Sequence, residues 1–277
     1  MLKVRSCDFS RWSNELLTTN LSILLIVAVA LLVGCGDKDD SWPRIEREGV
    51  LRVGLDPTFP PFEVTVESAD SADSGVAGLD VDLAHALAGE LGLEAEFVYF
   101  GYDGLYDALA TEQVDVLISA LVIVPGRMRD FAYSEPYFNA GEILVIPAGS
   151  TIEEMADLNG KRLAVELGAQ GHVEATQWAK RLPDLTVLPY ASAEYALDAV
   201  SAGEADAALV DGVSGRLYLK DHPSSALLRG GSPVTVEPYA MVARIEDEVL
   251  LAKLDEALSS LTATGELESL IERWLGA

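Results

Sequence analysis

Cysteine and histidine are scarce in this chain of 277 residues. The two cysteines are Cys7 and Cys35, and the three histidines, His85, His172 and His222, are widely separated. Two cysteines cannot build a disulfide scaffold or a cysteine-based zinc cluster, and three scattered histidines argue against a histidine-rich metal site. The sequence therefore predicts a protein that uses neither a metal ion nor a cofactor.

Positive charge is also in short supply, because 19 Lys and Arg residues face 45 Asp and Glu residues and give a formal net charge of -26. A surface this acidic repels phosphate backbones, and no basic stripe offsets it, so we expect no nucleic-acid binding. Hydrophobic residues make up 49% of the chain, which excludes intrinsic disorder. The length allows one large domain or two domains of roughly 100 residues each.

Long hydrophobic runs are limited to residues 21–33, LSILLIVAVALLV. As a helix this run would span about 20 Å, which is short of the roughly 30 Å hydrocarbon core of a bilayer. A slight excess of positive charge precedes it, as in a signal peptide. The run leads into Leu-Val-Gly-Cys at residues 32–35, which resembles a bacterial lipobox, where the chain is cut before the cysteine and lipid joins the sulfur. The alternative is an ordinary signal anchor with an incidental cysteine.

We therefore expect residues 1–34 to be a lipoprotein signal peptide and Cys35 to carry the lipid. Residues 35–48 would be a polar tether. The mature protein would lie outside the cytoplasm, in the periplasm or on the outer cell surface, anchored to a membrane.

After the expected tether, short strand-like runs alternate with amphipathic segments. The expected strands are residues 50–55, 94–100, 114–124, 162–165, 186–188 and 205–210. The expected helices are residues 78–91, 105–111, 173–180, 193–202, 247–261 and 266–274. This alternation predicts an α/β fold with largely parallel sheets. Residues 66–78 are small and acidic, which is typical of an exposed hairpin loop.

Two segments share one form, a helix followed by a short acidic turn and an apolar strand. The first covers residues 105–118 and has Asp115 before the strand, and the second covers residues 196–209 and has Asp206. This recurrence predicts two similar lobes. Ligands of α/β sheets bind beyond the carboxyl ends of the strands, so we expect the site in the loops after Leu55, Ile118, Val165 and Val210.

Six segments carry a recognisable pattern. They are LRVGLDPTFPPFE (51–63), GLDVDLAHALAGELGLEAEFV (78–98), YDGLYDALATEQVDVLISALVIVPGRMRDFAYSEPYF (102–138), DLNGKRLAVELG (157–168), ALDAVSAGEADAALVDG (196–212) and TVEPYAMVA (235–243). In this order they resemble bacterial extracellular solute-binding proteins of family 3, the polar amino-acid-binding proteins of ABC transporters. The resemblance implies a two-lobed, periplasmic-binding-protein-like fold of type II, with a ligand cleft between lobes joined by two hinge strands.

By analogy with that family, the hinges fall near residues 139–141 and 236–238. Lobe one would comprise residues 49–139 and 238–277, and lobe two residues 140–237. The resemblance implies a non-enzymatic receptor that captures a free, polar or basic L-amino acid by lobe closure. It would act as a monomer and deliver the amino acid to the transmembrane subunits of an ABC permease.

A buried amino acid brings an ammonium and a carboxylate out of water, so its site needs one fixed cation and one fixed anion. Arg127 suits the carboxylate, because a guanidinium binds two oxygens in one plane, and it matches the family's carboxylate-binding arginine. Asp211, which follows the apolar residues 207–210, matches the ammonium-binding aspartate. The competing interpretations are a solvated arginine like Arg129, and a helix or turn cap at Asp211.

Further positions follow from the same resemblance. Ser119 matches the residue whose carbonyl or hydroxyl oxygen meets the ammonium. Phe59 and Tyr102 match aromatic residues that sandwich the ligand side chain, whereas Phe62 is expected to pack beneath them. Asp56 matches a residue that contacts polar or cationic side chains, although it could instead cap the following turn.

Some positions depart from the family pattern. Val122 stands where Ser or Thr is usual, and so offers only its backbone N–H. Ala169 and Gln170 replace a usual pair of hydroxyl residues, a loss of about 1 kcal/mol of net hydrogen bonding unless Gln170 compensates. Glu166 could reach the distal end of the ligand or remain solvated, and His172 is expected to have a surface or capping role.

Two other functions remain open at this point. A periplasmic dehydratase of the cyclohexadienyl type has a similar fold and would need a general acid, for which Glu166 and His172 are the candidates. A sensory protein that acts through a partner is the third class.

Overall fold

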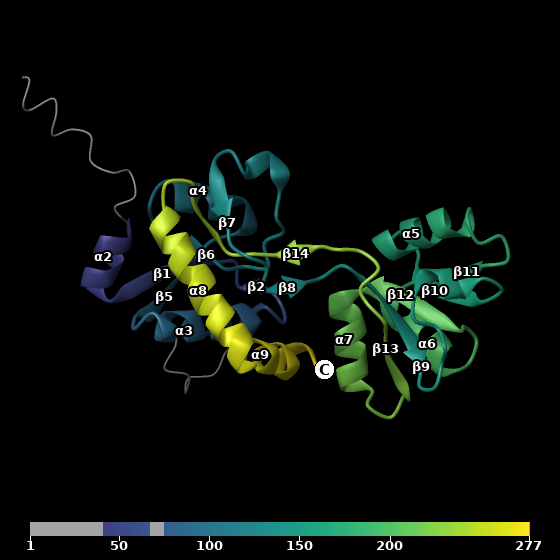
Figure 1. The fold of residues 1–277 in the computed structure, drawn as a ribbon. Coiled ribbons are helices and arrows are strands. Elements are labelled where there is room, and N and C mark those ends of the chain that lie inside the picture. Colours follow the sequence, from purple (N-terminus) through teal and green to yellow (C-terminus); the bar gives the residue numbers. More distant parts are fainter. Residues whose placement is uncertain (1–40, 67–74, 277) are drawn as a thin grey trace, which may run out of the picture. The chain divides into compact units, whose positions relative to one another are not determined.

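The computed structural model describes residues 41–66 and 75–276 (Figure 1). These residues form two five-stranded sheets, of strand order β5-β1-β6-β15-β7 and β11-β10-β12-β9-β13. Each sheet has its own helices and its own hydrophobic core on both faces. The two sheets confirm the predicted α/β fold with two lobes, which we call the first and second lobe in the order of the sheets above.

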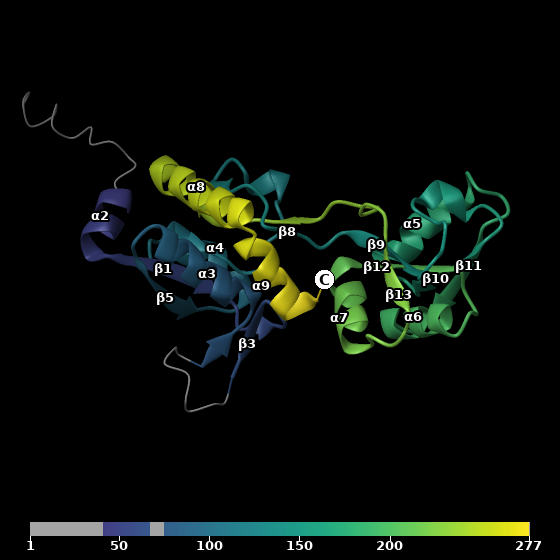
Figure 2. The same ribbon diagram turned by 60° about the horizontal axis from the view of Figure 1, so that its bottom comes forward.

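The first lobe is built on β1 (Val50–Leu55), β5 (Glu94–Tyr99), β6 (Val116–Leu117), β7 (Phe131–Tyr133) and β15 (Val242–Arg244). Its helices are α2 (Ser41–Glu48), α3 (Leu79–Glu90), α4 (Leu105–Ala110), α8 (Glu248–Thr264) and α9 (Glu266–Leu275). Apolar residues of α3, α8 and α9 pack on one face of the sheet, whereas those of α4 pack on the other face. Figure 2 shows α8 and α9 beside α3. The short strands β2 (Thr58–Phe59), β3 (Glu63–Thr65) and β4 (Val76–Ala77) form a small sheet beside it.

The second lobe is built on β9 (Glu142–Pro147), β10 (Arg162–Glu166), β11 (Thr186–Tyr190), β12 (Ala207–Asp211) and β13 (Leu227–Gly230). One face carries α6 (Ala193–Ser201) and α7 (Gly212–Asp221). The other face carries α5 (Gln170–Ala179) and the 3-10 turn Met155–Leu158. Between the lobes along the chain, β8 (Phe138–Asn139) pairs antiparallel with β14 (Pro238–Tyr239).

The sheets are mixed rather than largely parallel. In each sheet three strands are parallel, β5-β1-β6 and β11-β10-β12, and two further strands run antiparallel to their neighbours. Three of these four strands, β7, β13 and β15, have only three or four residues, and the sequence pattern predicted none of the four. The expected strand at residues 114–124 is also reduced to β6, because Ala120 adopts a left-handed backbone (φ 44) and donates its N–H to the buried carboxylate of Asp80 at 2.6 Å.

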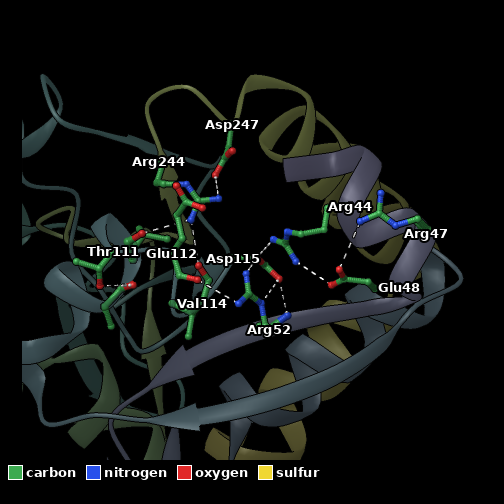
Figure 3. Close-up of polar contacts among 12 residues, drawn as sticks. Arg44, Arg47, Glu48, Arg52, Thr111, Glu112, Val114, Asp115, Arg244 and Asp247 are labelled. Atoms are coloured by element: carbon green, nitrogen blue, oxygen red, sulfur yellow. Dashed lines mark hydrogen bonds and ion pairs between the residues drawn. The ribbon is translucent and has the colours of Figure 1, made fainter. Parts of the chain in front are cut away.

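Residues 41–48, expected as the end of the tether, form helix α2. Trp42 and Ile45 of this helix are buried in the core of the first lobe. Arg44 reaches from α2 to the buried carboxylate of Asp115 and also pairs with Glu48 at 3.1 Å (Figure 3). The segment is therefore attached to the lobe by both apolar burial and an ion pair.

The two lobes repeat one polar contact, which joins the acidic turn of each recurrent helix–turn–strand segment to an arginine of a neighbouring strand. In the first lobe Arg52 donates to both oxygens of Asp115, at 2.7 and 3.2 Å (Figure 3). In the second lobe Arg162 donates to both oxygens of Asp206, at 3.0 and 3.2 Å. Each aspartate also accepts the backbone N–H of its arginine, so each pair fixes the start of one strand to the turn before another.

No helix within the described ranges is both long and apolar enough to cross a bilayer. Residues 1–34 and Cys35, with the expected signal peptide and lipid, lie outside the described residues.

Candidate functional site

Three of the predicted site residues meet where β1 and β6 end. These strands are parallel neighbours, so their carboxyl ends open at the same edge of the sheet. The backbone N–H of Asp56 donates to Ser119 Oγ at 3.0 Å, and Tyr102 donates its backbone N–H to Asp56 Oδ2 at 2.8 Å. The hydroxyl of Thr58 donates to Asp56 Oδ1 at 2.8 Å. Asp56 therefore holds the loops at this edge together, whatever else it binds.

Two aromatic side chains lie exposed at the same edge. Phe59 is 46% exposed and Tyr102 is 60% exposed. The ring of Phe59 stacks on Phe62 with a centroid separation of 5.7 Å and an interplanar angle of 16°. Phe62 is fully buried, as predicted, and contacts Phe138 and Tyr239 edge-on. Buried aromatic packing thus fixes Phe59, while its outer face stays open to a ligand.

Arg127 ends the 3-10 turn Pro125–Arg127, and its guanidinium carbon lies 3.8 Å from the centroid of the Tyr106 ring. A guanidinium stacked on an aromatic face keeps its in-plane N–H donors available. Within residues 41–66 and 75–276, no acid forms an ion pair with Arg127. By contrast, the neighbouring Arg129 pairs with Asp130 at 2.9 Å. Arg127 is thus oriented but has no acidic partner of its own, as a carboxylate-binding arginine requires.

Asp211 is the last residue of β12 and the N-cap of α7. Its Oδ1 accepts the backbone N–H of Val213 at 3.1 Å and of Ser214 at 2.8 Å. The capping role considered for Asp211 is therefore real. Capping uses one carboxyl oxygen, and Oδ2 makes no hydrogen bond with any described residue, so capping and ammonium binding are compatible.

The other predicted residues of the second lobe surround α5. Glu166 ends β10 and is half-buried, and Gln170 is the exposed first residue of α5. His172 Nδ1 accepts the backbone N–H of Gly168 at 3.1 Å, which is the expected capping role. In the first lobe Val122 is half-buried and forms an isolated antiparallel bridge with Tyr239.

The sequence pattern did not single out Glu142, the first residue of β9. Its side chain is only 5% exposed, and it stands directly opposite Asp211 in the antiparallel pair of β9 and β12. Burial raises the pKa of Glu142 to about 7, with the carboxylates of Asp211, Glu237 and Glu166 adding to the effect. The sequence feature that could have pointed to Glu142 is an acid at the first position of an otherwise apolar run, EILVIP at residues 142–147.

A second buried acid pair lies beneath the loop that holds Ser119. Glu63 and Asp80 are both fully buried, and Asp80 Oδ2 accepts the backbone N–H of Ala120 at 2.6 Å and the hydroxyl of Tyr137 at 2.9 Å. Burial, together with the neighbouring Asp80, raises the pKa of Glu63. Burial also raises the pKa of Asp80 to about 7, so the pair keeps protons that exposed acids would lose, and a protonated Glu63 can donate to Asp80.

Three or more His, Cys, Asp or Glu side chains do not gather into a possible metal site anywhere in the described part of the chain.

Comparisons with known proteins show the family of the chain. The model for bacterial extracellular solute-binding proteins, family 3, matches residues 51–277. The L-cystine-binding protein TcyJ of Escherichia coli is 28% identical over 263 residues, which cover 92% of this chain and 95% of that protein. The lysine/arginine/ornithine-binding periplasmic protein of Escherichia coli is 27% identical over 257 residues, covering 90% and 95%.

Among solved structures, the L-cystine solute receptor of Neisseria gonorrhoeae, in an unliganded open conformation, is similar with a TM-score of 0.71 and 26% identity. The similarity covers 84% of this chain and 96% of the receptor.

Proposed function

Because the chain belongs to the bacterial extracellular solute-binding proteins of family 3, we propose that it is the substrate-binding component of an ABC importer for a free amino acid. Membership of this family places the protein outside the cytoplasm and favours a binding protein over an enzyme. The observation that carries the proposal is Arg127, a guanidinium oriented by Tyr106 and without an acidic partner among the described residues.

In this proposal Arg127 binds the carboxylate of the ligand, and the free oxygen of Asp211 binds its ammonium. Ser119 and the N–H of Val122 line the site beside them, while Phe59 and Tyr102 pack on the ligand side chain. Asp56, Glu166 and Gln170 would contact its polar end. The charged groups are suitable because an amino acid that leaves water loses several kcal/mol of hydration per ion, which only fixed opposite charges can offset.

The lobes of the proposed receptor are residues 49–139 with 238–277, and residues 140–237. The pairing of β8 with β14 lies at the proposed crossings between them. Ligand drives closure of the lobes only through contacts that are better in the closed state. The closed monomer would then dock on the permease, held at the membrane by lipid on Cys35 after removal of the signal peptide 1–34.

Isothermal titration against a panel of amino acids tests the proposal. Arg127→Ala is expected to weaken binding by about 2 kcal/mol or more, roughly 30-fold, because the ligand carboxylate loses a charged partner. Asp211→Asn should do the same for the ammonium, and it keeps an oxygen to cap α7. Arg129→Ala is the matched control and should leave the affinity unchanged. A folded wild-type protein that binds no amino acid would rule the receptor out.

The enzymatic alternative is weaker. The N–H of Gly168 takes up Nδ1 of His172, one of the two candidate general acids, so only Nε2 of that ring could donate a proton to a substrate. Incubation with arogenate or prephenate decides the matter, since a dehydratase would form phenylalanine or phenylpyruvate. A sensor that acts through a partner would bind the same amino acids. It would differ from an importer because it would still bind its partner protein in cells whose uptake of the amino acid is abolished.

A further inference from the structure

Glu142 lies in the second sheet at the end where the parallel strands β10 and β12 have their carboxyl ends, which is the end of the proposed ligand site. It opens β9, and its Cα is paired with that of Asp211 at the end of β12. Side chains directly opposite in an antiparallel pair lie on the same face with Cβ atoms about 5 Å apart. The carboxyl groups of Glu142 and Asp211 are therefore neighbours on one face of the sheet, at the carboxyl end of β12.

One oxygen of Glu142 is buried without a partner. The side chain is 5% exposed, and Oε2 has no hydrogen bond to any described residue. A buried oxygen of this kind costs free energy unless a proton or a cation satisfies it. The acids that face Glu142 are Asp211, Glu166 and Glu237, and all three raise its pKa. The backbone N–H of Gly171, at the start of α5, acts in the opposite direction and lowers the pKa of Glu142.

The first turn of α5 leaves room for this carboxyl group. A Cβ atom at Gly171 would stand 2.6 Å from Glu142 Oε2 and 2.7 Å from the carbonyl oxygen of Leu209, so only glycine fits beside the acid. Glu142 thus packs against the first turn of α5, the helix that begins at Gln170, and beside the end of β12, which carries Asp211.

The charges of the site do not balance for a zwitterion. Arg127 offsets a ligand carboxylate and Asp211 offsets an α-ammonium, which leaves the acids Asp56, Glu166 and Glu142. Of these three, Glu142 has the buried oxygen without a hydrogen-bond partner among the described residues. Resting on the proposed function, we propose that Glu142 is a further ligand-binding residue, which selects an amino acid with a second cationic group, of the lysine, ornithine or arginine type. When such a ligand binds, Glu142 takes up its second cation beside Asp211.

The pKa of about 7 gives the proposal a second readout. Near neutral pH a fraction of the Glu142 carboxyl groups is protonated in the empty protein. A cation at Glu142 favours the ionised form, so binding of lysine releases protons, whereas binding of neutral glutamine does not. Titration calorimetry at pH 7 in two buffers of different ionisation enthalpy measures this release on the wild-type protein and needs no variant.

The variant test compares lysine, ornithine and arginine with glutamine. Glu142→Gln is expected to lower the ratio of affinity for lysine over glutamine at least tenfold and to abolish the proton release. Glu204→Gln, which removes an exposed acid of the same lobe, should change neither. An unchanged ratio in a folded Glu142→Gln protein, or proton-neutral lysine binding by the wild type, would overturn the role of Glu142. Failure of the wild type to bind any amino acid would overturn the receptor instead, so the two failures are distinguishable.

Discussion

The buried pair of Glu63 and Asp80 makes the stability of the first lobe depend on pH in an unusual direction. Burial raises the pKa of Glu63 above its value in the unfolded chain, which is about 4.3. Glu63 therefore binds one more proton in the native protein than in the unfolded chain over the pH range between these two values, whereas Asp80, whose pKa burial raises to about 7, is present in the wild type and in the variant below alike. The stabilising contribution is complete below the unfolded pKa and is lost as the pH rises through the folded pKa.

Replacement of Glu63 by glutamine should remove this dependence. The amide has the same shape, carries no charge and can donate to Asp80 as the protonated acid does. A difference of one proton corresponds to a slope of about 1.4 kcal/mol per pH unit, so between pH 5 and pH 7 the wild type should lose about 2.7 kcal/mol relative to Glu63→Gln. The variant is thus expected to match the wild type near pH 4 and to exceed its stability at pH 7.

Urea unfolding followed by circular dichroism at pH 5, 6 and 7 measures the difference in the free energy of unfolding. Glu90→Gln, at the exposed end of α3, is the matched control and should run parallel to the wild type. Parallel profiles for Glu63→Gln and the wild type would refute the reasoning, because the buried acid would then have no extra proton in the native state.

Three further stability predictions follow from single contacts. Asp115→Ala should cost about 2–3 kcal/mol because it removes a fully buried carboxylate that accepts charged hydrogen bonds from Arg44 and Arg52, whereas Asp206→Ala, at a 32% exposed side chain, should cost below about 1 kcal/mol; thermal unfolding compares the two. Gly78→Ala should cost at least about 3 kcal/mol in chemical denaturation, because φ is 152 and the new Cβ would stand 1.9 Å from the carbonyl oxygen of Phe62. Ile45→Ala should cost about 2–5 kcal/mol by the same assay if α2 is part of the fold, and nothing if it is only a tether.

Much of the fold could be predicted from the sequence, since long apolar periodicities decide the long elements. The expected helix at residues 78–91 is observed as α3, and the expected strand at residues 50–55 is β1. Helix α7, GVSGRLYLKD at residues 212–221, was not predicted because it has few apolar residues. Its N-cap, Asp211, was interpreted first as a ligand-binding residue and only second as a cap. Strand β6 is short because the buried carboxylate of Asp80 draws Ala120 out of the sheet, a contact between residues 40 positions apart.

The candidate site was predictable where it depends on strand ends. Asp56 and Ser119 follow Leu55 and Ile118, two of the positions after which the site was expected, and they are in contact at 3.0 Å because β1 and β6 are parallel neighbours. Glu142 could not be found in this way. An acid at the start of a strand is usually solvated, and this one is buried only because Gly171 brings the first turn of α5 against it.

The two Arg–Asp pairs show why a local pattern predicts geometry better than energy. Arg52–Asp115 and Arg162–Asp206 have similar hydrogen bonds and the same place in their lobes, and each aspartate stands in one of the two recurrent sequence segments. Yet Asp115 is fully buried, whereas Asp206 is not, and Arg44 of α2 is an additional partner only for Asp115 (Figure 3). Helix α2 thus turns an exposed type of ion pair into a buried one, so its removal should make the two lobes equally tolerant of losing their aspartate.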